Sequence, residues 1–385
     1  MTKKYTEELE RGYSVSTVME EAQRCLLCYD APCSKACPAG TDPAKFIRSV
    51  RFRNFKGAAE TIRINNALGA VCARVCPTER YCESGCSRCG IDKPIDIGGI
   101  QRFVTDFEAA CGMKVLEKGT ANGKRVAVVG SGPAGLQAAA TLLQLGYEVE
   151  IYEKADRAGG FLRTIPEYRL PETVVDGEIE RIVALGAVIH CGVDVDKAKF
   201  EELKAGYDAV LVATGVRKPM ILDLFQGNPN VVSAVDLLTE IRSKHGEMNV
   251  PASALVLGGG DSAMDAATTL KMLGVKDVIE VTRNEFRASD AEKATAHEMG
   301  VITIGGYTPA AVDGKTVTFK HSRLNSELKI EAELIVVALG QNIDNELGLP
   351  VERNEVVAEG TSVDGKVFVA GDIAKGDKTV VAAVN

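Results

Sequence analysis

The sequence predicts an α/β protein with an all-helical, cysteine-rich N-terminal domain followed by two Rossmann-like dinucleotide-binding domains. Three observations predict this class. Nine of the 11 cysteines lie between Cys25 and Cys89, in a stretch with few strand-like runs. Two strand–glycine–helix–strand units then recur, at residues 125–152 and 254–282. The length of 385 residues is sufficient for two or three such domains.

Bulk composition excludes several classes of partner. The 45 Lys and Arg residues against 53 Asp and Glu give a net charge of −8, and no basic cluster stands out. This balance argues against binding to nucleic acid or to an anionic membrane. The first ten residues, MTKKYTEELE, lack the apolar core of a secretory signal, which predicts a cytoplasmic protein. Clustered cysteines in such a chain favour metal or redox centres over structural disulfides.

The first predicted domain covers residues 1–122. Apolar residues recur at helical spacing over Ala44–Arg51, Phe55–Asn65 and Gly98–Ala110, so we expect short helices there. The polar stretch from Glu117 to Lys124 is typical of a linker.

The cysteines of this domain form two runs with short spacings. They are Cys25, Cys28, Cys33 and Cys37 in the first run, and Cys72, Cys76, Cys82 and Cys86 in the second. Short spacings closed by Cys-Pro are typical of iron–sulfur segments, in which the fourth cysteine often ligates a neighbouring cluster. Eight cysteines could therefore supply two clusters. Structural zinc is the alternative for Cys-x2-Cys pairs, but no histidine occurs in the first 189 residues. Cys111 and Cys191 are expected to be ordinary buried thiols.

The first glycine-rich turn follows the strand Arg125–Val129 and opens the predicted helix Ala134–Leu145. Its Gly-x-Gly-x-x-Gly pattern lets the backbone approach a pyrophosphate at a helix N-terminus. Glu153, at the end of the next strand, is expected to accept hydrogen bonds from a ribose hydroxyl. The predicted contacts of this nucleotide are Gly130, Gly132, Pro133, Ala134, Gly135, Glu153 and Gly160.

The second glycine-rich turn has the same pattern of small residues after a strand, and it is expected to bind a nicotinamide cofactor. Its predicted contacts are Gly258, Gly260, Asp261, Ser262 and Arg283. Arg283 could clamp the 2′-phosphate of NADP, or it could stack on adenine. Asn284 interrupts the arginine pair of many NADP-dependent relatives, which favours NADH and leaves NADPH as the alternative.

Two further strand ends resemble those of flavoproteins with two dinucleotide domains. One strand ends in Ala213-Thr214-Gly215, and a second ends in Gly371-Asp372. The resemblance implies that the first nucleotide is FAD, contacted by Gly371 and Asp372. It also implies an FAD domain over residues 123–216 and 335–385, with the NAD(P)H domain of residues 217–334 inserted in it.

No acid or base is predicted, because hydride passes directly from nicotinamide to flavin. The four histidines are scattered along the chain, and no cysteine follows Cys191. The second nucleotide domain therefore lacks the redox-active Cys-x-x-Cys pair of disulfide reductases. The cysteine-rich domain is the remaining exit for electrons.

The cysteine-rich motifs also carry a family resemblance. The segments Cys25–Pro38, Phe52–Arg63 and Asn66–Pro77 resemble the flavin and iron–sulfur subunits of bacterial NAD-dependent dihydropyrimidine dehydrogenases. More distantly, the chain resembles glutamate synthase small subunits.

The resemblance implies a ligand set for each of two 4Fe–4S clusters. The sets are Cys25, Cys28, Cys33 and Cys86 for one cluster, and Cys37, Cys76, Cys82 and Gln101 for the other. Counting cysteines alone would instead select Cys72 as the eighth ligand. The segment Ile97–Gln101 favours the set with the glutamine, because it matches the dihydropyrimidine branch.

The resemblance further implies an electron-input subunit. NADH would reduce FAD, and the two clusters would carry electrons to an FMN-containing partner subunit that reduces uracil or thymine, in a heterotetramer. The alternative is the small subunit of glutamate synthase or a related NAD(P)H-dependent electron-transfer flavoprotein. In the family more residues follow the segment that ends here at Asn385, so the resemblance also implies a longer protein.

Overall fold

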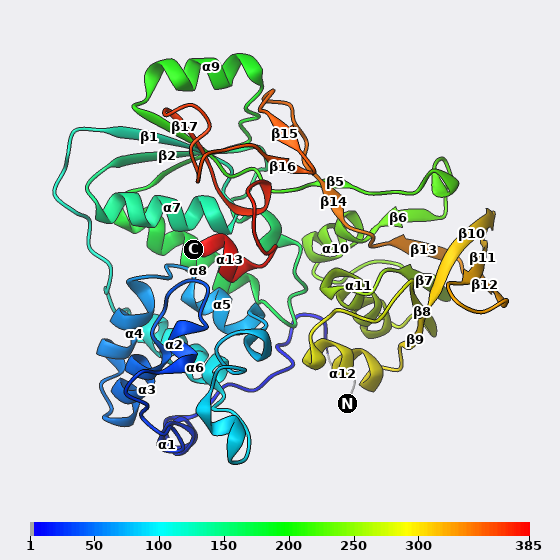
Figure 1. Ribbon diagram of the computed structural model, residues 1–385, viewed down its shortest axis with the longest axis horizontal. Helices are drawn as coiled ribbons and strands as arrows, with labels where there is room; N and C mark the ends of the chain where they lie inside the picture. Colours follow the sequence, from blue (N-terminus) through cyan, green and yellow to red (C-terminus); the bar gives the residue numbers. More distant parts are fainter. Residues whose placement is uncertain (1–3) are drawn as a thin grey trace. The chain divides into compact units, whose positions relative to one another are not determined.

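A computed structural model describes residues 4–385, which divide into two compact units (Figure 1). The larger unit contains Glu10–Leu162, Glu172–Val216 and Ile343–Asn385. The smaller unit contains Arg163–Pro171, Arg217–Asn342 and the described residues up to Leu9. The domain boundaries drawn from the sequence stay predictions, and the first three residues of the predicted iron–sulfur domain lie outside the described residues.

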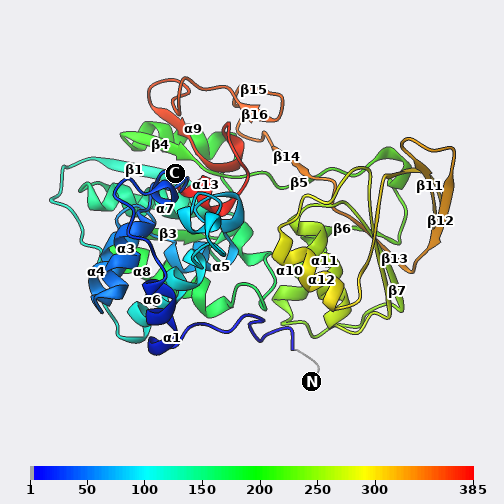
Figure 2. The same ribbon diagram turned by 60° about the horizontal axis from the view of Figure 1, so that its bottom comes forward.

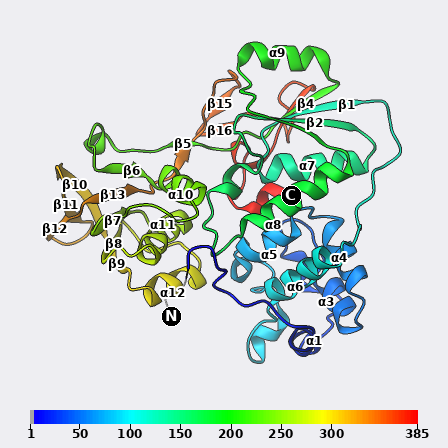
Figure 3. The ribbon, with the colours of Figure 1, turned by 180° about the vertical axis from the view of Figure 1, so that it is seen from behind.

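The larger unit begins with short helices, as the apolar spacing predicted. They are α1 (Val15–Gln23), α2 (Pro32–Lys35), α3 (Pro43–Arg51), α4 (Phe55–Arg63), α5 (Gly69–Val75) and α6 (Ile97–Ala110), with the 3-10 turns η1 (Thr78–Arg80) and η2 (Ser87–Gly90). Side chains cap four of them at the N-terminus, from Ser14, Asp42, Asn54 and Asp96. The apolar faces of α1, α3, α4 and α6 meet in one buried core. Figure 3 shows these helices from behind.

A five-stranded parallel sheet completes the larger unit. Its order is β17-β4-β1-β2-β3. The strands are β1 (Arg125–Val129), β2 (Glu148–Glu153), β3 (Val188–Cys191), β4 (Ala209–Val212) and β17 (Val367–Val369), with helices α7 (Pro133–Gln144), α8 (Glu172–Leu185) and α9 (Lys197–Gly206). A short helix, α13 (Val380–Val384), packs against α7.

The predicted linker is held against this sheet domain. The N–H of Gly119 donates to the carbonyl of Leu143, and the N–H of Asn122 donates to that of Gly146. Residues 117–124 therefore follow the C-terminal end of α7.

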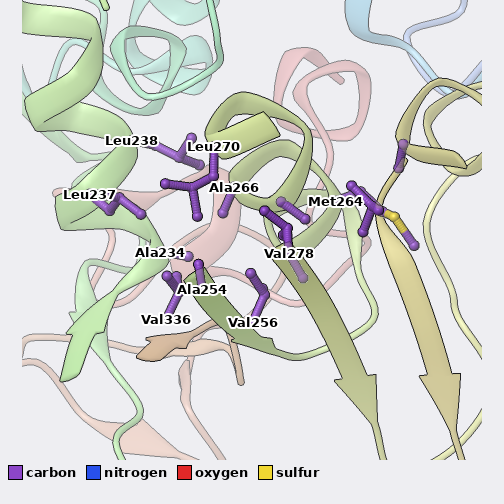
Figure 4. Close-up of a cluster of buried hydrophobic side chains, with 14 of the residues drawn as sticks. Ala234, Leu237, Leu238, Ala254, Val256, Met264, Ala266, Leu270, Val278 and Val336 are labelled. Carbon is purple, nitrogen blue, oxygen red and sulfur yellow. The ribbon is translucent and has the colours of Figure 1, made fainter. Parts of the chain in front are cut away.

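The smaller unit contains a second parallel sheet, in the order β6-β13-β7-β8-β9. Its strands are β6 (Val231–Ser233), β7 (Ser253–Leu257), β8 (Asp277–Thr282), β9 (Ile302–Gly305) and β13 (Leu334–Val337), and its helices are α10 (Ala234–Ser243), α11 (Asp261–Met272) and α12 (Asp290–Glu298). In Figure 4, Leu237 and Leu270 from the helices point toward Val256 and Val278 of the strands. All five strands fall between β4 and β17 in the chain, which confirms the predicted insertion.

A three-stranded antiparallel sheet was not predicted. It consists of β10 (Tyr307–Asp313), β11 (Thr316–His321) and β12 (Glu327–Glu331). Val317 and Phe319 are fully buried against Leu255 and Val337, on the face of the parallel sheet opposite α10 and α11 (Figure 2). The Asp313-Gly314 turn between two alternating segments is the sequence signal that could have identified this hairpin.

Two short antiparallel ladders complete the strands. They pair β5 (Lys218–Pro219) with β14 (Gln341–Asn342), and β15 (Val351–Glu352) with β16 (Glu355–Val356). Among residues 4–385, no helix is both long and apolar enough to cross a membrane.

Glu280 is a buried acid in the middle of the smaller unit's sheet. It lies on β8 between Val256 and Thr303 of the neighbouring strands and is fully buried. Neither carboxylate oxygen has a hydrogen-bond partner. Burial raises the pKa of Glu280 from 4.5 to about 8. The folded protein therefore keeps this proton at neutral pH, whereas the unfolded chain releases it. The free energy of unfolding consequently falls as the pH rises from 4.5 to about 8, and the contribution of Glu280 is constant at higher pH.

We predict that Glu280→Met, which removes this acid at similar volume, stabilises the smaller unit more at pH 8 than at pH 5, because the acid carries no charge at pH 5. The difference between the two gains should be on the order of 3–5 kcal/mol, from the size of the pKa shift. Calorimetric unfolding at both pH values measures it, with the exposed Glu331→Met as the control. An equal gain at both pH values would contradict the prediction.

Candidate functional site

The first glycine turn joins β1 to α7 with two glycines that no other residue could replace. Gly130 has a φ of 103°, and a Cβ placed there would lie 2.5 Å from the carbonyl oxygen of Ala213. A Cβ at Gly135 would lie 2.0 Å from the carbonyl oxygen of Gly130. A Cβ at Gly132, by contrast, would meet nothing within 4 Å. Space for a ligand therefore lies in front of Gly132.

The start of α7 is suited to an anion. Gly132 is the N-cap of α7, and no side chain bonds the amides of the first turn, where Pro133 and Ala134 lie. Free amides at a helix N-terminus attract a phosphate group. The open space at Gly132 and the uncapped helix together fit a dinucleotide pyrophosphate.

Two segments distant in sequence approach this turn. Gly160 has a φ of 54°, and its Cβ would lie 2.8 Å from the Cα of Gly132. Gly371, in the 3-10 turn η5 (Gly371–Ile373), has a φ of 73°, and its Cβ would lie 2.8 Å from that of Ala134. Asp372 follows it, and burial raises the pKa of Asp372. The structure thus gathers these predicted contacts around the start of α7.

Glu153 has a partner that the sequence reasoning missed. Its carboxylate is buried and accepts hydrogen bonds from the backbone N–H of Ser131 at 3.0 Å and of Ala155 at 2.9 Å. The hydroxyl of Ser131 bonds the same carboxylate and accepts from the N–H of Gly159. Glu153 therefore stabilises the glycine turn against the neighbouring loop of Ala155 and Gly159. The contact of Glu153 with a ribose stays a prediction.

The second glycine turn repeats this construction in the smaller unit. A Cβ at Gly258 would lie 2.4 Å from the carbonyl oxygen of Ala338, whereas one at Gly260 would meet nothing within 4 Å. No side chain caps α11, whose N-cap is Gly260 and whose first residues are Asp261 and Ser262. This turn also fits a pyrophosphate.

Asp261 begins α11 directly after that turn, and Arg283 follows the next strand, β8. The carboxylate of Asp261 accepts from the N–H of Ser289 at 3.1 Å, and Arg283 is exposed just after β8. Arg287, which the sequence reasoning missed, donates its backbone N–H to the carbonyl of Gly259 and is exposed. A second arginine therefore accompanies this turn, and the preference between NADH and NADPH stays a prediction.

Four cysteines line one cavity in the helical part. They are Cys25, Cys28, Cys33 and Cys86, and the empty volume including the open mouth is about 350 Å³. These are the residues that the family resemblance assigned to one cluster. Burial, with the nearby charges of Cys86 and Cys25, raises the pKa of Cys33 to about 11. Positively charged iron would offset this cost of forming thiolates, so the donor set fits a cluster.

The other cysteines form a second group. Burial and the charges of Cys72, Cys82 and Cys37 raise the pKa of Cys76. Gln101, on α6, donates from its amide nitrogen to the carbonyl of Gly69 at 2.8 Å, which leaves the amide oxygen as the atom that could bind iron.

Cys72 competes with Gln101 for the eighth ligand position. It is buried within α5, and burial raises the pKa of its thiol to about 12, against the opposing effect of a side-chain hydrogen bond with Asn66. The choice between the two residues stays a prediction.

The cysteine sulfurs are too widely spaced for zinc. Among residues 4–385, no three cysteine Sγ atoms lie within 4.8 Å of one another. Four sulfurs around one zinc ion lie about 3.8 Å apart, given a zinc–sulfur distance of about 2.3 Å. This spacing argues against the zinc alternative.

The expectation for the last two cysteines was wrong. Cys111 and Cys191 are both exposed. Each lies at the end of a regular element, Cys111 as the C-cap of α6 and Cys191 as the last residue of β3, where the core no longer covers the chain.

Glu83 is a further residue that the sequence reasoning missed. It follows Cys82, and its carboxylate accepts from the N–H groups of Ile97 at 2.9 Å and Gly98 at 3.2 Å. The side chain therefore caps α6, so the segment of Cys82 is tied to the helix of Gln101.

A buried charge network joins the helical part to the sheet domain within the larger unit. The guanidinium of Arg63, on α4, bonds Glu108 of α6 at 2.8 Å and Glu178 of α8 at 2.6 Å. The guanidinium of Arg181 forms an ion pair with the other oxygen of Glu108, at 2.9 Å. Glu178 also accepts from the N–H of Ala70, in the first turn of α5. Figures 1 and 3 both show α5 beside α8.

Comparison with known proteins identifies the family. Residues 2–113 match the family described as dihydropyrimidine dehydrogenase domain II, 4Fe-4S cluster, and residues 124–385 match the pyridine nucleotide-disulphide oxidoreductases. The chain is 53% identical to the NAD-dependent dihydropyrimidine dehydrogenase subunit PreT of Escherichia coli O157:H7, over 99% of this chain and 94% of the relative. The chain belongs to the PreT family. It is therefore an oxidoreductase of iron–sulfur, flavin and NAD type, which confirms the predicted kinds of cofactor.

Two further relatives extend the comparison. The glutamate synthase (NADPH) small chain of Azospirillum brasilense is 30% identical over 98% of this chain and 88% of its own length. The structure of T. acidophilum thioredoxin reductase covers 68% of this chain and 94% of its own, with a TM-score of 0.53 and 19% identity. This likeness confirms the predicted fold class.

We predict that Arg63→Met destabilises the larger unit by about 3–5 kcal/mol, because it leaves two buried carboxylates without their partner. The control is Arg157→Met, whose guanidinium is 57% exposed and pairs with Glu172 and Asp176; it should cost under about 1 kcal/mol. Urea unfolding of the holoprotein measures both. Equal losses would mean that the buried network contributes no more than a surface pair.

We predict that Gln101→Ala alters one cluster only and that Cys72→Ala spares both. The reason is that the amide oxygen of Gln101 can serve as a ligand, whereas Cys72 is expected to be a buried thiol of α5 that binds no iron. Iron content and electron paramagnetic resonance (EPR) spectra of the reduced protein measure this. Loss of iron from Cys72→Ala with an unchanged Gln101→Ala would reverse the assignment.

Proposed function

We propose that this chain is the electron-input subunit of a dihydropyrimidine dehydrogenase. It takes electrons from NADH and delivers them to an FMN-containing partner subunit, with which it forms a heterotetramer and which reduces uracil or thymine to the 5,6-dihydro product. The observation that carries the proposal is the 53% identity to a PreT subunit over 99% of this chain.

Each part of the chain has a defined task in this proposal. Gly130, Gly132 and Asp372 would hold FAD, and Gly258 and Gly260 would hold NADH. The two cysteine sets, with Gln101, would hold two 4Fe–4S clusters. The flavin takes two electrons as a hydride and the clusters carry them singly, so the protein need only bind, orient and exclude water.

The residues between these sites support transfer within the larger unit. Glu178, on the helix α8 beside the sheet that would bind FAD, accepts from the N–H of Ala70 in the first turn of α5, whose C-cap is Cys76. Gln101 donates to the carbonyl of Gly69 in the same turn. Hydrogen bonds therefore tie the sheet domain to the helix that leads to the second cysteine group.

A glutamate synthase small subunit is the second candidate. The 30% identity to the Azospirillum brasilense small chain favours it, and the 53% identity to PreT outweighs it. The two candidates differ in the partner, which is an FMN protein in one case and an amidotransferase subunit in the other.

We predict that the isolated chain oxidises NADH with ferricyanide as acceptor and does not reduce uracil. Uracil-dependent oxidation of NADH should require co-purification with the FMN subunit. Spectrophotometric assays with NADH and NADPH, each with and without uracil, measure both statements. Uracil reduction by the chain alone, or a partner that uses glutamine and 2-oxoglutarate, would overturn the proposal.

A matched pair of glycine variants provides the control for this assay. Gly260→Val fills the open space in front of α11 and should raise KM for NADH at least tenfold while flavin content stays unchanged. Gly206→Val, at the end of α9 where a Cβ also meets nothing within 4 Å, should leave KM unchanged.

A further inference from the structure

The segments that supply the first cysteine group are joined by charged side chains beside the sulfurs. Cys25 follows Arg24 in the first segment, and Cys86 precedes Arg88 and Asp92 in the second. The carboxylate of Asp92 bonds Arg88 through both oxygens, at 2.8 and 3.0 Å, and bonds Arg24 at 3.2 Å. One carboxylate therefore joins two guanidinium groups that lie 64 residues apart in the chain.

Backbone carbonyls complete this connection. Arg88 also donates to the carbonyl of Arg24 at 2.9 Å, and Arg24 donates to the carbonyl of Lys93 at 2.8 Å. Glu21, on α1, accepts from the other side of Arg24 at 2.6 Å. The planar fork of arginine suits such multiple, fixed contacts. These contacts form a bridge of Arg24, Arg88 and Asp92. The bridge holds the segment of Cys86 against the segment of Cys25.

The bridge stands at the cavity itself. Arg88 lines the cavity together with Cys25, Cys28, Cys33 and Cys86. The remaining lining is largely apolar, from Leu26, Ala31, Pro32, Ala44, Ile47, Ile95 and Ile97. Charges act more strongly across apolar surroundings than across water. Arg51 is another cation nearby, since it donates to the carbonyl of Cys25 at 3.4 Å.

A surface ion pair usually contributes little to stability, and Arg24 and Arg88 are each 22% exposed. Their placement beside four thiols suggests a task in electron transfer instead. An added electron makes a cluster more negative, so a nearby cation stabilises the reduced form and a nearby carboxylate opposes it.

We propose that the charge of Arg88, which the carbonyl of Arg24 and the side chain of Asp92 hold beside the first cysteine group, raises the reduction potential of the cluster held there, and that the negative charge of Asp92 partly offsets this effect. This inference rests on the proposed function for the presence of that cluster. In this inference the bridge sets the reduction potential of one cluster, and therefore how readily that cluster accepts an electron.

The experiment is an EPR-monitored redox titration of the holoprotein and its variants, with iron content measured on the same samples. Arg88→Gln should shift the ratio of reduced to oxidised cluster about tenfold toward the oxidised form at a given potential, or about 59 mV for a one-electron couple. Asp92→Asn keeps a side-chain oxygen that can accept from Arg88, and the carbonyls of Arg24 and Lys93 still bind the two arginines. It should therefore shift the same cluster in the opposite direction, because only the negative charge is lost. The second cluster should not change in either variant.

Two further variants separate charge from structure. Arg88→Lys keeps the charge without the fork, so it should stay closer to the wild type than Arg88→Gln does. Arg125→Gln, which removes a guanidinium paired with Glu150 in the sheet domain, should shift neither cluster. If Arg88→Gln loses iron, the Asp92→Asn titration decides: a shift toward the reduced form at a given potential supports the charge effect, and no shift or a shift toward the oxidised form overturns it.

The outcomes also distinguish this inference from the proposed function. Two cluster signals with unshifted potentials in Arg88→Gln and Asp92→Asn would overturn the inference alone. Shifts of equal sign in the two variants would likewise overturn it, because a purely structural bridge predicts no opposition. Absence of cluster signals from the wild-type holoprotein would overturn both.

Discussion

The buried pairing of Arg63 with Glu108 and Glu178 is the interaction on which the larger unit depends. All three side chains are at least 98% buried, and a charge so far from water is tolerated only with partners on every side. Arg63 and Glu108 come from α4 and α6, whereas Glu178 comes from α8 beside the parallel sheet. The helical part and the sheet domain therefore cannot separate without exposing or orphaning these charges, and they behave as one body.

The same network also limits the movement of the candidate redox groups. Glu178 bonds the first turn of α5, and Gln101 bonds the same turn through the carbonyl of Gly69. Electron transfer depends on fixed separations between donors and acceptors. Hydrogen bonds that begin at the sheet domain and end beside the second cysteine group provide such a separation without a covalent link.

The sequence allowed much of the framework to be predicted, because the signals there are local. Glycine turns need particular φ values, and the helical spacing of α3, α4 and α6 reflects a buried face. Arg63 and Glu178 could not be paired from sequence, since they lie 115 residues apart and either could have been a surface residue. The contact of Glu153 with Ser131 also escaped prediction, because a serine inside a glycine turn carries no distinctive signal. The β10–β12 sheet was missed because its strands are short and the Asp313-Gly314 turn was not recognised as a hairpin signal.

The two cysteine runs show why spacing alone could not assign ligands. Cys33 lies within α2, a helix of four residues, and Cys37 follows its C-cap, Ala36. Cys33 lines the cavity of the first group, whereas Cys37 lies near Cys76 of the second. Gly85, from the second run, approaches this helix so closely that a Cβ there would lie 3.1 Å from the carbonyl oxygen of Pro32. The second run thus packs against the first, and Cys86 lines the same cavity as Cys25, Cys28 and Cys33. This packing supports the predicted ligand set, which is drawn from both runs. With that set, neither run would hold a cluster until the other had folded against it.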